Sequence, residues 1–316
     1  MSPGSFNKYR HKFGVLSFSY APYSHFRGSL ESGQNYTVNL GDYIQSIGTH
    51  RALEALGVSG SDIIYVDRDR LGEYNGEPVN LIMNGMFTPS NFPMSKKINP
   101  VFFGFSYHPD NIIPADDKVL FEDSITYFLG RKIGCRDRST AECLLAYGLD
   151  AYVTGCLSQS FETTHSTVRD LLPVLICGID DPKVEEWLML SFPNHIRLKD
   201  QRRPAVTHPL SPLDIEDCRR SANALISLYR DHVSLVFTSL MHCASPCASL
   251  GIPTVVIRQD PDNLRFSDLK EHLPVLASGR VMQEFKTQDL GRVAATLNRR
   301  SAMLDMLADV VAGAAI

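Results

Sequence analysis

The sequence predicts an α/β protein with two doubly wound, Rossmann-like domains that face a cleft. Short apolar runs typical of buried strands alternate with helical stretches along the chain. The alternation occurs on both sides of a polar stretch near residues 157–170, which is rich in Ser and Thr as a linker should be. The length of 316 residues suits about two domains of roughly 100–200 residues each. We therefore expect a first domain over residues 1–160 and a second over residues 165–316.

In the first half, apolar runs predict strands at residues 13–20, 61–67, 79–85, 99–107, 132–135 and 151–155. A helix over residues 41–57 carries its apolar positions on one face and ends at Gly57. A second helix over residues 140–148 is expected to take Ser139 as its cap and to end at Gly148.

The second half repeats this order. Strands are predicted at residues 171–177, 233–239 and 254–257. Three helices are predicted between them: one with Asp181 as cap and Pro182 at its first position, a long amphipathic one over 211–232, and a short one that begins near His242. The stretch from Thr287 to the end has helical spacing and is a candidate to pack back across the domains.

Composition excludes several classes of function. A net charge of −4 gives no overall basic surface, so we expect no nucleic-acid partner. No apolar run approaches the ~20 residues that span a bilayer, and the polar first residues do not resemble a signal peptide. The seven cysteines are scattered without a CxxC pair, which is typical of a reducing cytoplasm. His242, Cys243 and Cys247 lie close together, but no second ligand pair stands out, so we expect no metal.

Three polar segments follow predicted strands and could meet in the cleft, because ligands of open α/β sheets bind at the carboxyl ends of the strands. The first is residues 39–42, where Asp42 is either a helix cap or a general base. The second contains Arg136, which either grips an anion or pairs with Asp137 at the surface. The third contains His242, which is either a catalytic acid or a core residue that donates to a backbone carbonyl.

Together these segments resemble the polysaccharide pyruvyl transferase family. The resemblance is carried by NLGDYIQSIG, IGCRDRSTAECLLAYGLDAYVTG and FTSLMHCASPCASLGIPTVVI, in this order. It implies a two-domain fold of the glycosyltransferase-B type, with the acceptor on the first domain and the donor on the second. It also implies transfer of the enolpyruvyl group of phosphoenolpyruvate to sugar hydroxyls as a pyruvate ketal, with neither metal nor cofactor.

The resemblance also assigns roles to single residues. It implies Asp42 as the base for the acceptor hydroxyl and His242 as the general acid. It implies a donor-binding set made of Arg136, Asn39, Gly41 and Ser239.

Two positions depart from the family pattern. Leu240 stands where many members have Arg, and Asp262 stands where some have Lys. Both of the missing groups are cations, so Arg258 and Arg265 are expected to supply the charge from nearby positions.

The acceptor is expected to be a polysaccharide or its lipid-linked precursor, reached in the cytoplasm or at the inner face of the plasma membrane. Aromatic and imidazole groups near strand ends are weak candidates for stacking on a sugar, with core packing as the alternative for each: Tyr20, Tyr23, His25, Phe87, Tyr107 and His108. Two other functions stay open. One is a nucleotide-sugar-dependent glycosyltransferase of the same fold, and the other is a glycan-binding protein without catalysis.

Overall fold

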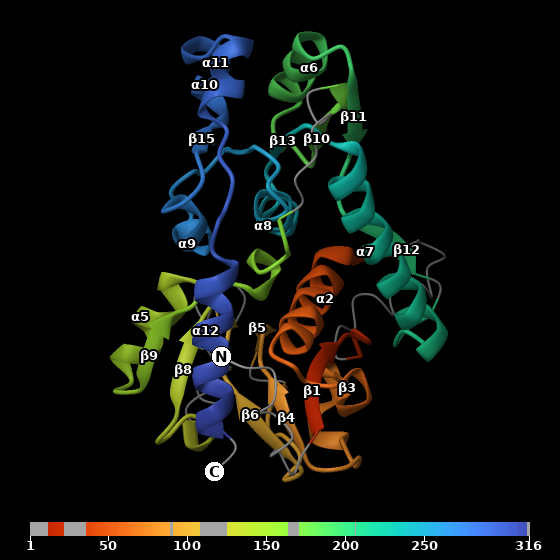
Figure 1. Ribbon diagram of the computed structural model, residues 1–316, viewed down its shortest axis with the longest axis vertical. Helices are drawn as coiled ribbons and strands as arrows, with labels where there is room; N and C mark the ends of the chain where they lie inside the picture. The colour runs from red at the N-terminus through yellow and green to blue at the C-terminus, as the bar shows by residue number, and fades with distance from the viewer. Residues whose placement is uncertain are drawn as a thin grey trace.

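Two parallel β-sheets, stacked end to end, organise the chain (Figure 1). The computed structural model describes residues 12–21, 36–88, 91–107, 125–163, 171–205 and 207–314. Every strand pair within the two sheets is parallel, which requires a crossover connection between paired strands.

The first sheet consists of two four-stranded parts, which meet where the Gly134 amide donates to the Phe102 carbonyl at 3.1 Å. One part runs in the order β3 (Ile63–Asp67), β1 (Lys12–Ser17), β4 (Val79–Ile82), β6 (Ile98–Val101). The other runs in the order β5 (Gly85–Phe87), β7 (Phe105–Tyr107), β8 (Lys132–Cys135), β9 (Asp150–Val153). The predicted strand over 99–107 is therefore broken between β6 and β7. Gly104 has φ +66 there, and a Cβ on it would lie 2.0 Å from the Asn84 side chain, so the chain bends at a position that only glycine fits.

The second sheet runs in the order β11 (His195–Leu198), β10 (Val174–Cys177), β13 (Leu235–Thr238), β14 (Thr254–Arg258), β15 (Val275–Ala277). In both sheets the first strand along the chain lies between the second and the third. This reversal of strand order creates a crevice at the carboxyl ends of β1 and β4, and another at those of β10 and β13, where ligands of such folds bind.

Helices cover both faces of each sheet. The first sheet packs α2 (Leu40–Ala55) and α12 (Arg300–Ala314) on one face and α5 (Arg138–Ala146) on the other. The second packs α6 (Pro182–Ser191), α10 (Ser278–Glu284) and α11 (Thr287–Val293) on one face. Its other face packs α8 (Met241–Ser249) and α9 (Ser267–Lys270). The predicted fold class, two doubly wound Rossmann-like sheets, is confirmed by this architecture.

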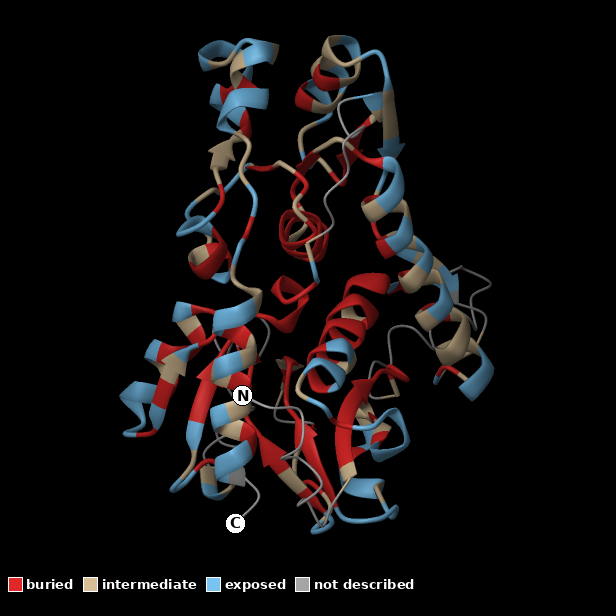
Figure 2. Ribbon diagram, in the orientation of Figure 1, coloured by how far each residue is buried: buried red, intermediate tan, exposed pale blue. Residues whose placement is uncertain are grey.

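The central helix is α8, which is buried from its second residue onward and lies between the two sheets (Figure 2). Short 3-10 turns complete the described elements: η1 (Gly60–Asp62), η2 (Arg68–Glu73), η4 (Ile125–Tyr127), η5 (Leu157–Gln159) and η7 (Leu264–Phe266). Of the described helices, none is long and apolar enough to cross a membrane.

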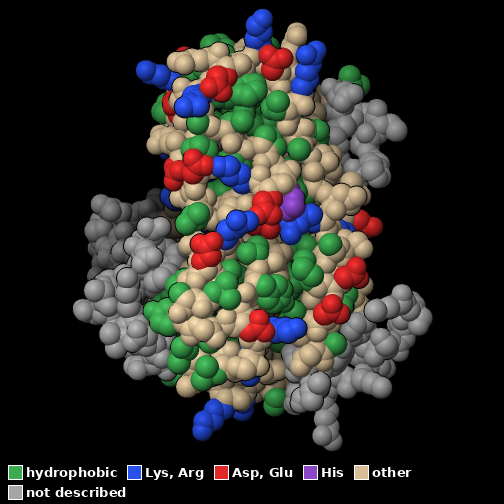
Figure 3. All heavy atoms as spheres, turned by 90° about the vertical axis from the view of Figure 1, so that its left-hand side faces the viewer, with side chains coloured by type: hydrophobic (Ala, Val, Ile, Leu, Met, Phe, Trp, Pro, Cys, Tyr) green, Lys and Arg blue, Asp and Glu red, His purple; other side chains and the backbone are tan. Residues whose placement is uncertain are grey.

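The two halves of the chain are joined by more than the linker. Strand β2 (Tyr36–Asn39) pairs antiparallel with β12 (Arg202–Ala205), which belongs to the second half. Helix α7 (Pro212–His232) runs down from the second sheet beside α2 (Figure 1). On another face, charged side chains gather at mid-height (Figure 3). Helix α5 contacts α9, and the ion pair Arg138–Glu271 (2.6 Å) links the two halves there. Helix α12 returns from the second half to cover the first sheet.

Several local predictions need correction. Ser139 does not cap α5: Asp137 does, because its Oδ1 accepts from the Thr140 amide at 2.9 Å and the helix begins two residues earlier than predicted. The helix expected from Thr287 to the end is two helices, separated by residues 294–299, which cross from the second sheet to the first. The cap at Asp181 with Pro182 after it is confirmed.

Candidate functional site

One cavity joins the carboxyl ends of both sheets and has a volume of about 650 Å³. It lies where the two crevices predicted by strand order face each other. Most of the residues singled out from the sequence line it, although they come from five separate segments: Asn39, Asp42, Arg136, Ser239, His242, Arg258 and Arg265.

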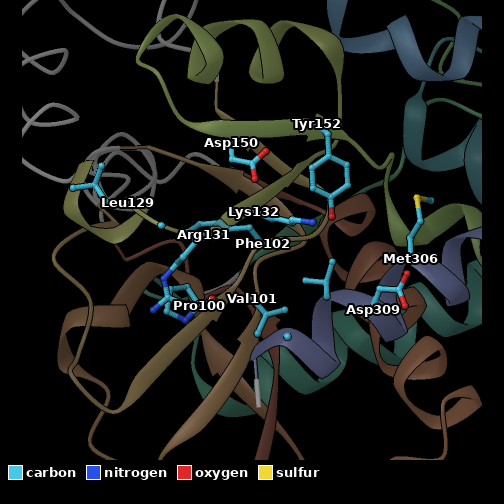
Figure 4. Close-up of a pocket in the computed structure, with 13 residues that line it drawn as sticks. Pro100, Val101, Phe102, Leu129, Arg131, Lys132, Asp150, Tyr152, Met306 and Asp309 are labelled. Carbon is cyan, nitrogen blue, oxygen red and sulfur yellow. Dashed lines mark hydrogen bonds between the residues drawn. The ribbon is translucent and has the colours of Figure 1, made fainter. Parts of the chain in front are cut away.

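A second cavity of about 870 Å³ lies between α12 and the β6, β8 and β9 strands (Figure 4). Its polar lining includes Lys132, Asp150, Tyr152 and Asp309 around an apolar floor. It contains none of the residues singled out from the sequence, and it lies toward the amino ends of β8 and β9, away from the crevices. The smaller cavity is therefore the candidate site.

His242 stands in the first turn of α8, with 9% of its surface exposed. Its ring packs on the backbone of Gly41, where a Cβ would lie only 2.8 Å from Nδ1. Among the described residues, the hydrogen-bonding neighbour of its ring is the Cys156 thiol, with Nε2 and Sγ 4.0 Å apart, and not a backbone carbonyl. The alternative of a core histidine bonded to a carbonyl does not describe this arrangement.

The charge state of His242 follows from its surroundings. Burial, followed by the positive charges of Arg136 and Arg265, lowers the pKa of His242 to about 3. The side chain is therefore neutral at pH 7 in the free protein.

Asp42 lies in the first turn of α2 but does not cap it. Asn39 is the cap, because its Oδ1 accepts from the Gly41 amide at 3.0 Å. Asp42 Oδ2 instead accepts from the Tyr20 hydroxyl at 2.6 Å, and Oδ1 lies 3.4 Å from Asn39 Nδ2. Burial raises the pKa of Asp42, while Arg68 and the Tyr20 hydrogen bond oppose that rise. The carboxylate is thus held in place and made more basic than an exposed one.

Arg136 follows β8 and is 3% exposed, so it is not the surface arginine of the alternative interpretation. Its Nη2 donates to Ser106 Oγ at 2.6 Å, and Asp137 Oδ2 lies 3.7 Å from its Nε. Asp137 is itself fully buried as the cap of α5. These contacts fix the guanidinium at the wall of the cavity, where it can face an anion.

The two departures from the family pattern have a structural counterpart. Leu240 lines the cavity and packs on Gly178, where a Cβ would lie 2.7 Å from its side chain. Asp262 forms an ion pair with the exposed Lys270. Arg258 and Arg265 both line the cavity. Desolvation and the neighbouring Arg136 lower the pKa of Arg265, as expected of cations crowded around one site.

The hydroxyl of Ser239 is already used within the fold. It donates to the Ile257 carbonyl at 2.8 Å and accepts from the Asp180 amide at 3.1 Å. Arg258 Nη1 donates to the Ser239 carbonyl at 2.7 Å, so Ser239 orients this arginine as well as lining the cavity.

The aromatic candidates divide into three groups. Tyr20 lines the cavity, with its hydroxyl on Asp42. Phe87 and Tyr107 are buried in the core of the first sheet, so packing describes them better than sugar binding. The other three lie outside the described residues: Tyr23, His25 and His108.

Sequence reasoning missed other residues of the cavity wall. Arg68 is 2% exposed and stacks over Phe18, with 4.7 Å from Cζ to the ring centre. Gln201 donates to the His242 carbonyl at 3.0 Å. Lys199 and Arg202, close to Gln201 in the second half of the chain, also line the cavity. Arg68 directly follows the predicted strand over 61–67, and this position is the feature of the sequence that could have identified it as a site residue. Nowhere in the described part of the chain do three or more His, Cys, Asp or Glu side chains group as a metal site would require.

Comparisons with known proteins complete the description. No curated protein matches the sequence. A functionally uncharacterised protein from Klebsiella pneumoniae is similar at 13% identity, over 81% of this chain and 87% of that one, with a TM-score of 0.41. A protein from Listeria monocytogenes with the proposed name UDP-N-acetylglucosamine 2-epimerase is similar at 12% identity, over 96% of each chain, with a TM-score of 0.45. Likenesses this distant carry no argument about function.

The sequence model of one family spans all three polar segments of the cavity. It covers residues 39–261, which is well over half of the chain and runs from the Asn39 cap past Arg258. This chain therefore belongs to the polysaccharide pyruvyl transferase family.

Proposed function

We propose that the cavity binds phosphoenolpyruvate and transfers its enolpyruvyl group to two hydroxyls of a glycan, forming a pyruvate ketal. The observation that carries the proposal is the convergence of Arg136, Arg258 and Arg265 with His242 and Asp42 on one cavity. Phosphoenolpyruvate is a trianion near neutral pH and needs several fixed cations. The first turns of α2 and α8 also meet there, and their amide dipoles add favourable potential for an anion.

The two sides of the cavity have different chemical characters. The second half contributes Arg258, Arg265 and His242, so we assign the donor to it, with Arg136 reaching across from the first half. The first half contributes Asp42 and the Tyr20 ring, so we assign the acceptor hydroxyl to it.

His242 would protonate the methylene carbon of the donor, and the resulting oxocarbenium-like centre would be attacked by the first acceptor hydroxyl. Asp42 would take the proton of that hydroxyl. The bond to phosphate would then break, and the second hydroxyl would close the ketal as its proton passes to the departing phosphate. The products balance as one ketal and one inorganic phosphate.

This role requires a change in His242, which is neutral in the free protein because its pKa is about 3. A bound trianion would offset the charges of Arg136 and Arg265 and so raise that pKa. Donor binding should therefore take up a proton. Titration calorimetry in two buffers of different ionisation enthalpy measures this uptake, and His242→Gln should abolish it.

The deciding experiment measures phosphate release and ketal formation with phosphoenolpyruvate and a panel of glycan acceptors. Arg136→Ala should raise the donor KM at least tenfold, because it removes a buried charge-assisted contact. Arg138→Ala is the control, since Arg138 is exposed and pairs with Glu271 outside the cavity. Thermal stabilisation by a nucleotide sugar, without any by phosphoenolpyruvate, would favour a glycosyltransferase instead.

The same proposal locates the reaction in the cytoplasm, with a polysaccharide or its lipid-linked precursor as acceptor. All seven cysteines are free thiols, which suits a reducing compartment. Cell fractionation, with the protein recovered in the cytosol or at the inner membrane face, tests this location.

A further inference from the structure

Tyr20 has a backbone conformation that a bulky residue rarely adopts. Its φ is 58, in the left-handed region, and among the described residues it is the one non-glycine with a positive φ. Two contacts with residues distant in the sequence fix it. Its amide donates to Asp69 Oδ2 at 2.7 Å, and its carbonyl lies 3.0 Å from His208 Nε2. Strain of this kind persists where the surrounding structure holds a residue for a purpose.

The held conformation aims the side chain at Asp42. The Tyr20 hydroxyl donates to Asp42 Oδ2 at 2.6 Å, which is short for a hydrogen bond to a carboxylate. The ring is 6% exposed and lines the candidate site. Burial, followed by the charge of Asp42, raises the pKa of Tyr20 well above its usual value, so the hydroxyl keeps its proton and remains a donor.

The other carboxylate oxygen is held much less firmly. Asp42 Oδ1 has Asn39 Nδ2 at 3.4 Å, a long contact beside the 2.6 Å bond on Oδ2. A firm bond on one oxygen and a loose one on the other orients the carboxylate and leaves Oδ1 able to take a new donor.

We infer that Tyr20 is the positioning residue for Asp42, holding Oδ2 so that Oδ1 faces the acceptor hydroxyl and takes its proton. The inference rests on the proposed role of Asp42 as the base. Tyr20 need not touch the reacting atoms, because it acts through Asp42.

Charged and titratable groups from α2 itself and from four other elements also face this pair. Within the described residues they are Arg68 and Asp69 from η2, Arg136 after β8, Tyr43 from α2, Arg265 from η7 and His242 from α8. Tyr20→Phe leaves all of these in place and removes one donor from the ionised form of Asp42. The pKa of Asp42 should therefore rise in this variant.

The test compares the pH dependence of kcat/KM for phosphate release in wild type, Tyr20→Phe and Tyr43→Phe. The acid limb of the Tyr20→Phe profile should move to higher pH, with a loss on the order of tenfold on that limb. Tyr43 is the matched control, because its hydroxyl donates to the Phe18 carbonyl at 2.7 Å. Its profile should keep the wild-type midpoint.

A second measurement does not depend on catalysis. Carbon-13 NMR of labelled aspartate follows the titration of Asp42 directly, with Asp42→Asn to assign the signal. A higher midpoint in Tyr20→Phe supports the positioning role even if no glycan is pyruvylated, in which case only the proposed function fails. An unchanged midpoint in Tyr20→Phe overturns the inference, whatever the activity.

Discussion

Gly41 and His242 share one space between the first turns of two helices. The imidazole lies where a side chain at residue 41 would begin, so the glycine is required for the histidine to sit beside the cavity. The same contact brings the positive ends of α2 and α8 together, which favours an anion and disfavours a protonated His242. The site therefore depends on a residue that does not line it.

The Gly41→Ala substitution should affect turnover more than it affects stability. Its Cβ would lie 2.8 Å from Nδ1 and 2.9 Å from Cβ of His242, so the ring must move. We expect kcat/KM to fall by roughly 100-fold, because the His242 ring would be displaced by about 1 Å. The free energy of unfolding should fall by about 1–3 kcal/mol. Gly291→Ala, on the exposed side of α11 with no atom within 4 Å, is the control. Equal effects of the two variants on turnover would contradict the shared space.

His242 should also make stability depend on pH. Its folded pKa of about 3 lies below the usual value of about 6.5, so between these values only the unfolded chain binds the proton. Stability is therefore lost as the pH falls through this window. Urea unfolding at pH 7 and pH 5 should show a smaller loss for His242→Gln than for wild type. Equal losses of unfolding free energy in the two proteins would show that His242 has an ordinary pKa in the folded protein.

At the scale of elements, helix caps set the geometry of the cavity wall. Asp137 caps α5 through Thr140 and lies against Arg136, whereas Asp181 caps α6 through the Lys183 amide and does not itself line the cavity. The aspartate cap of α6 thus contributes to stability alone. The aspartate cap of α5 contributes to stability and also positions a residue of the site.

These two caps make a matched pair. Asp181→Ala should lower the unfolding free energy by about 1 kcal/mol and leave the donor KM unchanged. Asp137→Ala should cost more than this, because Asp137 is fully buried, and should also raise the donor KM by loosening Arg136. Thermal melts and initial rates measure both. If Asp137→Ala leaves the donor KM unchanged, the cap of α5 does not contribute to donor binding.

Most long elements could be predicted from the sequence, and so could the cavity residues that follow strands. The reason is that apolar periodicity and the Gly, Pro and capping residues at element ends are local signals. Asp42, Arg136 and His242 were recognised in this way. The strands β2 and β12 were missed because neither contains an apolar run and they pair with each other across the two halves. Gln201 was missed as a site residue, and Tyr20 was considered only for stacking on a sugar, because their roles depend on which strand ends meet. Ser139 was preferred to Asp137 because both are good caps and only the φ/ψ values decide.

At the scale of the molecule, a buried polar network joins the halves. Arg299 Nη1 donates to Asp268 Oδ1 at 2.8 Å and to Gln159 Oε1 at 2.7 Å, while Gln159 Nε2 donates to Asp268 Oδ2 at 2.6 Å. These three residues come from η5, α9 and the segment before α12. The network therefore fixes how the second half sits on the first.

Arg299→Met should weaken this junction strongly. It leaves the Asp268 carboxylate, which is 6% exposed, without its cation, so unfolding should cost about 3–5 kcal/mol less. Arg292→Met is the control, because Arg292 is 79% exposed and its pair with Asp289 should be worth under about 1 kcal/mol. Equilibrium urea unfolding measures both. Similar losses would mean that water already screens the network.

The return of α12 to the first sheet affects how the protein is made. Its buried residues Met303, Leu307 and Val311 pack on Phe13 and Val15 of β1, which leave the ribosome long before them. Until then only α2 covers that face of the sheet, through Ala52 and Leu53, and the nascent chain exposes the remaining apolar surface, to which a chaperone can bind. The first half can finish folding only after most of the second half has been translated.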